Sequence, residues 1–156
     1  IVLANLYLIF IPLTMCWISL LPAEIESKSL IPELRAIVGK DLAKKHNIRE
    51  DQISQMLGVT QAAVSNYIRG IRGDPKLIEK LLGEEQVANM INEISDDLSS
   101  DRAYTPSSLS KFIGLCNYIK SSLLICDIHH NLESDIDDEV CKECENMLLK
   151  GPGSVY

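Results

Sequence analysis

Aromatic residues are scarce in this chain, making up 5% of its 156 residues, and long runs of β-branched residues are missing. Because strands draw on both kinds of residue, long β-strands are not expected. The sequence has no phosphate-cradling glycine loop, and no serine or cysteine stands in a recognisable nucleophile motif. We therefore expect an all-α protein that is not an enzyme and has no evident small-molecule substrate.

Charged residues are absent from residues 1–23, which are largely apolar and long enough to cross a bilayer. Pro12 interrupts this run, and no Lys or Arg precedes it, so neither a signal peptide nor a positive-inside anchor is indicated. The chain begins with Ile1, and Met15 is an in-frame methionine. We set residues 1–22 apart as an apolar segment and expect residues 1–14 to reflect a misplaced gene start or a fragment. A membrane anchor is the alternative.

The charge of the remaining chain is divided unevenly. Residues 24–82 carry 10 Lys and Arg against 8 Asp and Glu, whereas residues 83–156 carry 5 against 14. Phosphate groups repel an acidic segment. We expect the C-terminal half to face away from nucleic acid or to contact a protein.

The segment from Asp51 to Arg72 predicts two short helices joined by a tight turn. Apolar residues recur at helical spacing in its first part, at Ile53, Met56 and Leu57. Gly58 can adopt the left-handed conformation that ends a helix. Thr60 suits the N-cap of a second helix, which we expect to run from Gln61 to about Arg69.

The second predicted helix separates into two faces. One face is apolar and can pack on the preceding helix, with Ala63, Val64, Tyr67, Ile68 and Ile71. The other face is small, amide-bearing or basic, with Gln61, Ala62, Ser65, Asn66 and Arg69. Gln and Asn can pair with adenine, Arg with guanine, and Ala leaves room for a thymine methyl in the major groove of DNA. We expect this second face at base edges, with Thr60 and Arg72 near phosphates; an ordinary helical hairpin in a core is the alternative.

The sequence QISQMLGVTQAAVSNYIRGIRG resembles the helix-turn-helix of Cro/C1-type regulators. The wider stretch, from LPAEI through IPELRAIVGKDLAKK to RGIRG, is similar to a family of small archaeal predicted transcriptional regulators. In that family a DNA-binding domain precedes a short cysteine-containing tail. The resemblance implies a lambda-repressor-like helical bundle and sequence-specific binding of double-stranded DNA, and it implies no known effector.

Further helices are expected on both sides of the predicted pair. Residues 23–29 predict a short helix, and residues 32–46 predict a longer one whose apolar stripe contains Leu34, Ile37, Val38 and Leu42. Apolar residues between Leu77 and Ile94 complete the core and offer surface for a homodimer. We place the DNA-binding domain at residues 23–94 and interpret the serine-rich residues 95–108 as a linker.

Residues 109–150 form a predicted helical appendage that contains Cys and His. Two pairs stand at chelate spacing, Cys126-x-x-His129 and Cys141-x-x-Cys144, and together they predict a tetrahedral zinc site. With Cys116 in place of His129 the set becomes four thiolates, which also suits an iron–sulfur cluster. Ordinary thiols are an alternative, as is a redox dithiol at Cys141 and Cys144.

The chain has five cysteines, an odd number, and no secretory signal, which favours a reducing cytoplasm over structural disulfides. We therefore expect a cytoplasmic, homodimeric DNA-binding regulator whose C-terminal thiolates sense metal or redox state. The alternative from another class is an antitoxin-like adaptor whose acidic tail binds a protein partner. A redox enzyme lacks support because the strand–helix context of a thioredoxin-like motif is missing.

Overall fold

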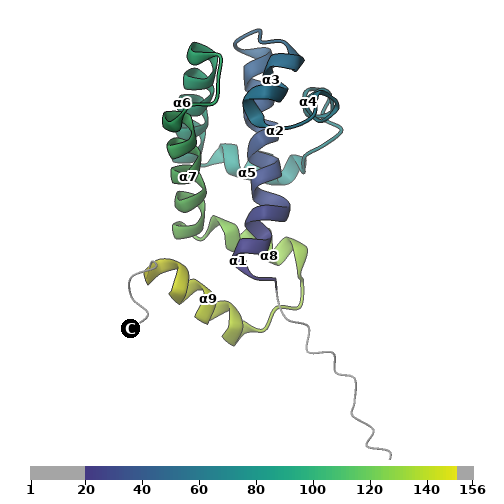
Figure 1. Cartoon of the computed structure of the whole chain (residues 1–156). Helices are drawn as coiled ribbons and strands as arrows, with labels where there is room; N and C mark the ends of the chain where they lie inside the picture. The colour runs from purple at the N-terminus through teal and green to yellow at the C-terminus, as the bar shows by residue number, and fades with distance from the viewer. Residues whose placement is uncertain (1–19, 151–156) are drawn as a thin grey trace, which may run out of the picture.

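The computed structural model describes residues 20–150, and these form an all-helical bundle (Figure 1). The elements are α1 (Pro22–Ile25), the π-helical turn η1 (Glu26–Leu30), α2 (Ile31–Lys44), α3 (Glu50–Leu57), α4 (Gln61–Ile68), α5 (Pro75–Gly83), α6 (Glu85–Asp101), α7 (Pro106–Ser121), α8 (Leu124–Leu132) and α9 (Asp138–Lys150). The all-α expectation is confirmed for this range. Within residues 20–150, no helix has the length and apolarity needed to cross a membrane. Most of the predicted apolar segment 1–22, including Met15, lies outside the described residues.

α1, η1 and α2 form one continuous helix that contains one wide turn. The N–H of Ile31 donates to the carbonyl of Glu26, a step of five residues instead of four. Pro32 explains this turn, because it has no N–H to donate to Lys28 and its ring pushes that carbonyl away. The sequence predicted two separate helices here, whereas the structure joins them end to end.

One hydrophobic core extends through the bundle and includes helices from both ends of the sequence. Residues that are almost fully buried in it come from α2, α3, α6, α7 and α8, among them Leu34, Ile53, Ile94, Leu115 and Ile125. Figure 1 shows α6 and α7 side by side next to α2. Within the predicted C-terminal appendage, α7 and α8 share the core of the preceding helices, and Leu148 of α9 packs against that core.

The segment predicted as a linker, residues 95–108, is mostly helical. α6 continues to Asp101, and both Ser95 and Leu98 are buried on it. A short turn follows, and Thr105 then caps α7 by accepting a hydrogen bond from the N–H of Ser108 at 3.2 Å. The linker prediction was wrong for residues 95–101 because serine and aspartate also occupy the outer faces of a packed helix.

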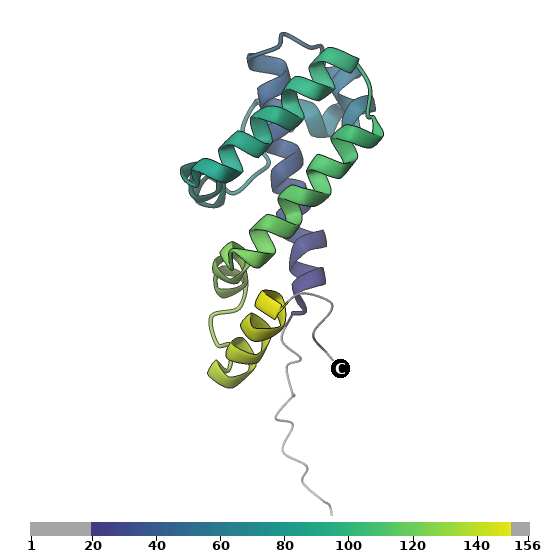
Figure 2. The ribbon, with the colours of Figure 1, turned by 90° about the vertical axis from the view of Figure 1, so that its left-hand side faces the viewer.

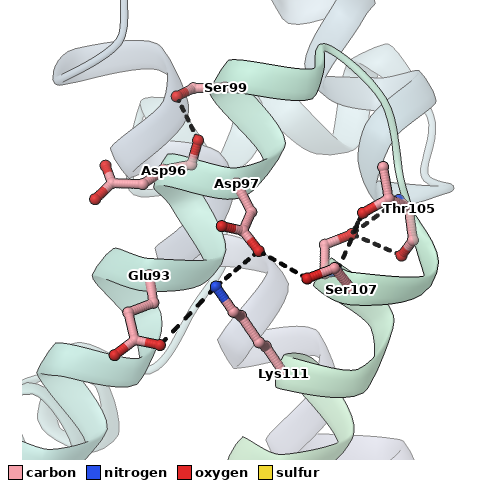
Figure 3. A network of polar contacts seen from close by, with 8 residues as sticks. Glu93, Asp96, Asp97, Ser99, Thr105, Ser107 and Lys111 are labelled. Atoms are coloured by element: carbon pink, nitrogen blue, oxygen red, sulfur yellow. Dashed lines mark hydrogen bonds and ion pairs between the residues drawn. The ribbon is translucent and has the colours of Figure 1, made fainter.

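Polar side chains join α6 and α7 along their outer edge (Figure 3). The ammonium of Lys111 lies 2.8 Å from Asp97 Oδ2, and the hydroxyl of Ser107 donates to the same carboxylate at 3.3 Å. The hydrogen bond from Lys111 lowers the pKa of Asp97. Exposed ion pairs add little stability, so these contacts should contribute little to the free energy of unfolding.

Candidate functional site

The turn between α3 and α4 is defined by two local features. Gly58 ends α3 in the left-handed region, with φ 62° and ψ 38°, and its N–H donates to the carbonyl of Ser54. Thr60 caps α4, because its hydroxyl oxygen accepts a hydrogen bond from the N–H of Ala63 at 3.2 Å. Both features agree with the sequence prediction, and together they fix the direction in which α4 leaves the turn.

The two predicted faces of α4 differ in burial. Ala63, Val64 and Tyr67 are buried against the bundle. We call the opposite side the outer face of α4; Gln61, Ala62 and Arg69 are exposed there, and Ser65 and Asn66 are half-buried. Ile71 was predicted on the buried face but is 65% exposed, because α4 ends at Ile68 and the chain then leaves the helical register.

The basic and amide groups of the outer face already contact each other. Arg69 donates from Nε to the carbonyl of Ser65 at 3.3 Å and from Nη2 to Asn66 Oδ1 at 3.2 Å. Both contacts are exposed, so other acceptors can replace them at small cost. Arg72 is exposed two residues beyond Gly70, and Thr60 is exposed at the other end of the helix.

Gly39 lies where α2 closely approaches the α3–α4 pair. A Cβ added at Gly39 would lie 3.2 Å from Leu57 Cδ1 and 3.5 Å from Tyr67 Cδ2. Gly39 is buried, and Ala36 of the same helix packs with Ala63 and Tyr67. Small residues on α2 thus bring the backbone of α4 close to the core and leave its outer face directed away from the bundle.

The loop after α4 is attached to α2 through Glu33. Its Oε1 accepts a hydrogen bond from the N–H of Asp74 at 3.0 Å, and Asp74 in turn caps α5 by accepting from the N–H of Lys76 at 2.9 Å. The second carboxylate oxygen of Glu33 is buried without a hydrogen-bond partner among the described residues. Burial raises the pKa of Glu33, and the hydrogen bond from Asp74 opposes part of that rise.

The raised pKa of Glu33 leads to a testable pH dependence. Because the folded state holds this proton more tightly than the unfolded state, ionisation costs stability as the pH rises from 4.5, the reference pKa, through the folded pKa. Glu33→Gln removes the ionisation. We expect the free energy of unfolding of the wild type, minus that of the variant, to fall across this window and then to level off. Urea unfolding at several pH values measures it, with Glu79→Gln at an exposed site as the control; a difference that rises with pH contradicts the prediction.

The predicted ligand cysteines fall into two groups. Cys116 is buried on α7 beside Glu26 and Lys120, and burial raises its pKa to about 11. Cys126 on α8 lies near Cys141 and Cys144 on α9. Burial raises the pKa of Cys126 to about 11, and the neighbouring Cys144, Glu145 and Cys141 add to that rise. The structure thus gathers three of the four thiols and gives Cys116 other neighbours.

The two adjacent histidines have different surroundings. His129 is buried, and its Nε2 lies 2.8 Å from Glu133 Oε2; this carboxylate also accepts a hydrogen bond from the N–H of Leu20. His130 is exposed, and its Nε2 lies 3.5 Å from Cys141 Sγ. Within residues 20–150, no three His, Cys, Asp or Glu side chains are close enough together in this structure to hold a metal ion.

A cavity of about 480 Å³ lies between the α3–α4 turn and α7, and no sequence pattern predicted it. Met56, Leu57 and Phe112 supply apolar lining, and Arg35 and Lys120 supply positive charge. Lys120 is paired with Glu26 at 3.0 Å. The volume falls in the range of small-ligand sites. Sequence reasoning could not find this cavity because its walls come from segments far apart in the chain.

Comparisons of the chain with protein-family models, with curated proteins and with solved structures found no match. The resemblance to Cro/C1-type regulators therefore rests on the residues quoted for it.

Proposed function

We propose that this protein is a sequence-specific transcriptional regulator that binds double-stranded DNA through α4. The outer face of α4 carries the proposal, because it combines exposed hydrogen-bonding groups with the absence of a large apolar side chain. α3 precedes it across a tight turn, which is the order found in DNA-binding helix-turn-helix motifs. The resemblance to Cro/C1-type regulators supports the same assignment.

The position of α9 is consistent with DNA binding at α4. Figure 2 shows α9 at the end of the bundle away from α3 and α4. α9 belongs to the half of the chain with 5 Lys and Arg against 14 Asp and Glu. An acidic helix at that end does not oppose the approach of phosphates to α4.

We further propose that the regulator is a cytoplasmic homodimer that reads two half-sites. Tyr104, Leu109 and Ile113 are 46%, 43% and 52% exposed, and all three border the cavity beside α7. Exposed apolar residues that gather in this way are typical of association surfaces. A dimer would present two copies of α4 to one DNA duplex.

The second candidate function is an adaptor that binds a protein through α9. Val140, Met147 and Leu149 of α9 are 49%, 45% and 61% exposed, and no residue of this helix is buried. Selection of DNA from a random-sequence library by gel shift separates the two proposals. Recovery of a common sequence supports the regulator, and recovery of none supports the adaptor.

Two arginines of the interface should affect DNA binding in different ways. Arg69→Ala should cost about 1–3 kcal/mol at one base pair and relax the preference there, because a bidentate contact with guanine is lost. Arg72→Ala should weaken binding to all sequences alike and reduce the salt dependence, because a phosphate contact is lost. Titration of the selected sequence and of its single-base variants at several salt concentrations measures both effects.

Lys142→Ala on α9 is the control for removing one positive charge, and it should leave affinity and preference unchanged. If Arg69→Ala also left both unchanged, α4 would not be the helix that contacts bases.

A further inference from the structure

The C-terminal helices place four ligand-type side chains in two pairs. Cys126 and His130 are four residues apart on α8, and Cys141 and Cys144 are three apart near the start of α9. Residues at either spacing lie on one face of a helix. The short segment 133–137 joins the two helices, so the two pairs belong to one helical hairpin.

One side chain from each pair already stands at the separation that a shared zinc ion requires. Zn–S and Zn–N bonds of about 2.3 and 2.0–2.1 Å in a tetrahedral site place the sulfur and nitrogen roughly 3.5 Å apart. Cys141 Sγ and His130 Nε2 are separated by 3.5 Å. Cys126 and Cys144 are the remaining thiols of the two pairs, one on α8 and the other on α9.

We propose that α8 and α9 form a zinc site with the ligands Cys126, His130, Cys141 and Cys144. Binding forms three Zn–S bonds and one Zn–N bond, and the three thiol protons pass to solvent. Three thiolates with one imidazole are a common ligand set for structural zinc. This site does not depend on DNA binding, and it replaces His129 by His130 in the set suggested by sequence spacing.

His130, rather than His129, is the fourth ligand because of the different surroundings of the two rings. His129 is 8% exposed and bonds Glu133, which connects it to the backbone of Leu20. That contact gives His129 a structural role between α8 and the start of the described chain. His130 points its Nε2 at Cys141, on the α9 side of the helix.

Closing the site requires a movement of α9 toward α8, since the side chains as they lie do not bring three ligands to one point. α9 has no buried residue, and its largest interface is with α7. Leu148 is partly buried against the core, and the other residues of α9 bury little apolar surface that would oppose its movement toward α8. A bound zinc ion would hold the two helices together. Small segments without a core of their own usually need such a cross-link.

The ligand set also separates zinc from an iron–sulfur cluster. A four-thiolate cluster would need Cys116. Cys116 is 5% exposed on α7, and its charged neighbours are Glu26 and Lys120. Moving it to α9 would disrupt the core around α7, whereas the imidazole of His130 is already beside Cys141.

The test is a metal titration of the full chain under reducing conditions after removal of metal. Co²⁺ should bind at one ion per chain and give the visible bands of a tetrahedral thiolate site, and Zn²⁺ should then displace it with loss of colour. His130→Ala and Cys144→Ser should each weaken Co²⁺ binding at least tenfold. Both positions lie outside the core, so circular dichroism should show that the bundle remains folded.

His129→Gln and Cys116→Ser are the matched controls and should retain the Co²⁺ spectrum and stoichiometry. Loss of the spectrum in His129→Gln but not in His130→Ala, with both proteins folded, would overturn the assignment. Failure of the wild type to bind Co²⁺ near one ion per chain would overturn the site itself. Neither result bears on DNA binding, which is measured separately by gel shift.

Discussion

Replacing Leu115 by Ala should lower the free energy of unfolding by about 2–5 kcal/mol, because it leaves a cavity in a packed core. Leu115 is fully buried on α7, in the same core as Leu34 of α2 and Ile94 of α6. A domain of this kind is stable by about 5–15 kcal/mol, so the loss is a large share of the total. Because the core is shared, we expect all the helices from α2 to α8 to lose stability together.

Urea unfolding followed by circular dichroism, together with hydrogen exchange of α2 and α7, measures this effect. Ser110→Ala is the control on the same helix; Ser110 is exposed, and its replacement should change stability by less than about 1 kcal/mol. If α7 lost its exchange protection while α2 and α3 kept theirs, residues 106–132 would form an independent unit.

The parts of the fold that the sequence predicted are those with local causes. Gly58 and Thr60 act within one turn of their own positions, so the end of α3 and the start of α4 could be placed from the sequence. Burial of Ala63 and Val64 followed from the period of α4. Ile71 departs from that period because the helix ends three residues earlier.

Features that depend on contacts between residues far apart in the chain could not be predicted from local sequence. Ser95 is buried on α6, although its serine-rich neighbourhood predicted a linker, since packing against a core can override local composition. The choice between His129 and His130 as a zinc ligand is of the same kind: the spacing from Cys126 suits either ring, and the proposal of His130 rests on the contacts of the two rings with Glu133 and Cys141. No local pattern reports such contacts.

The outer face of α4 remains a proposal, and its supports were only partly visible in the sequence. Glu33 holds the loop after α4 by accepting a hydrogen bond from the N–H of Asp74. Gly39 allows α2 to approach the α3–α4 pair. Both residues lie on α2. This helix therefore helps to position α4, although no residue of α2 belongs to the predicted DNA interface.

Gly39→Leu should therefore damage DNA binding more than its effect on folding suggests. The Cβ alone would lie 3.2 Å from Leu57 Cδ1, and the rest of the side chain must displace α3 or α4. Such overpacking costs about 1–3 kcal/mol, which leaves the fold intact, but a shifted α4 loses contacts that depend on its position. We expect at least a tenfold loss of affinity for the selected DNA with a single unfolding transition. Gly114→Ala on α7, whose added Cβ meets only Met90 Cε at 3.8 Å, is the control and should preserve affinity. Equal affinity in Gly39→Leu and the wild type would show that α4 is not positioned through α2.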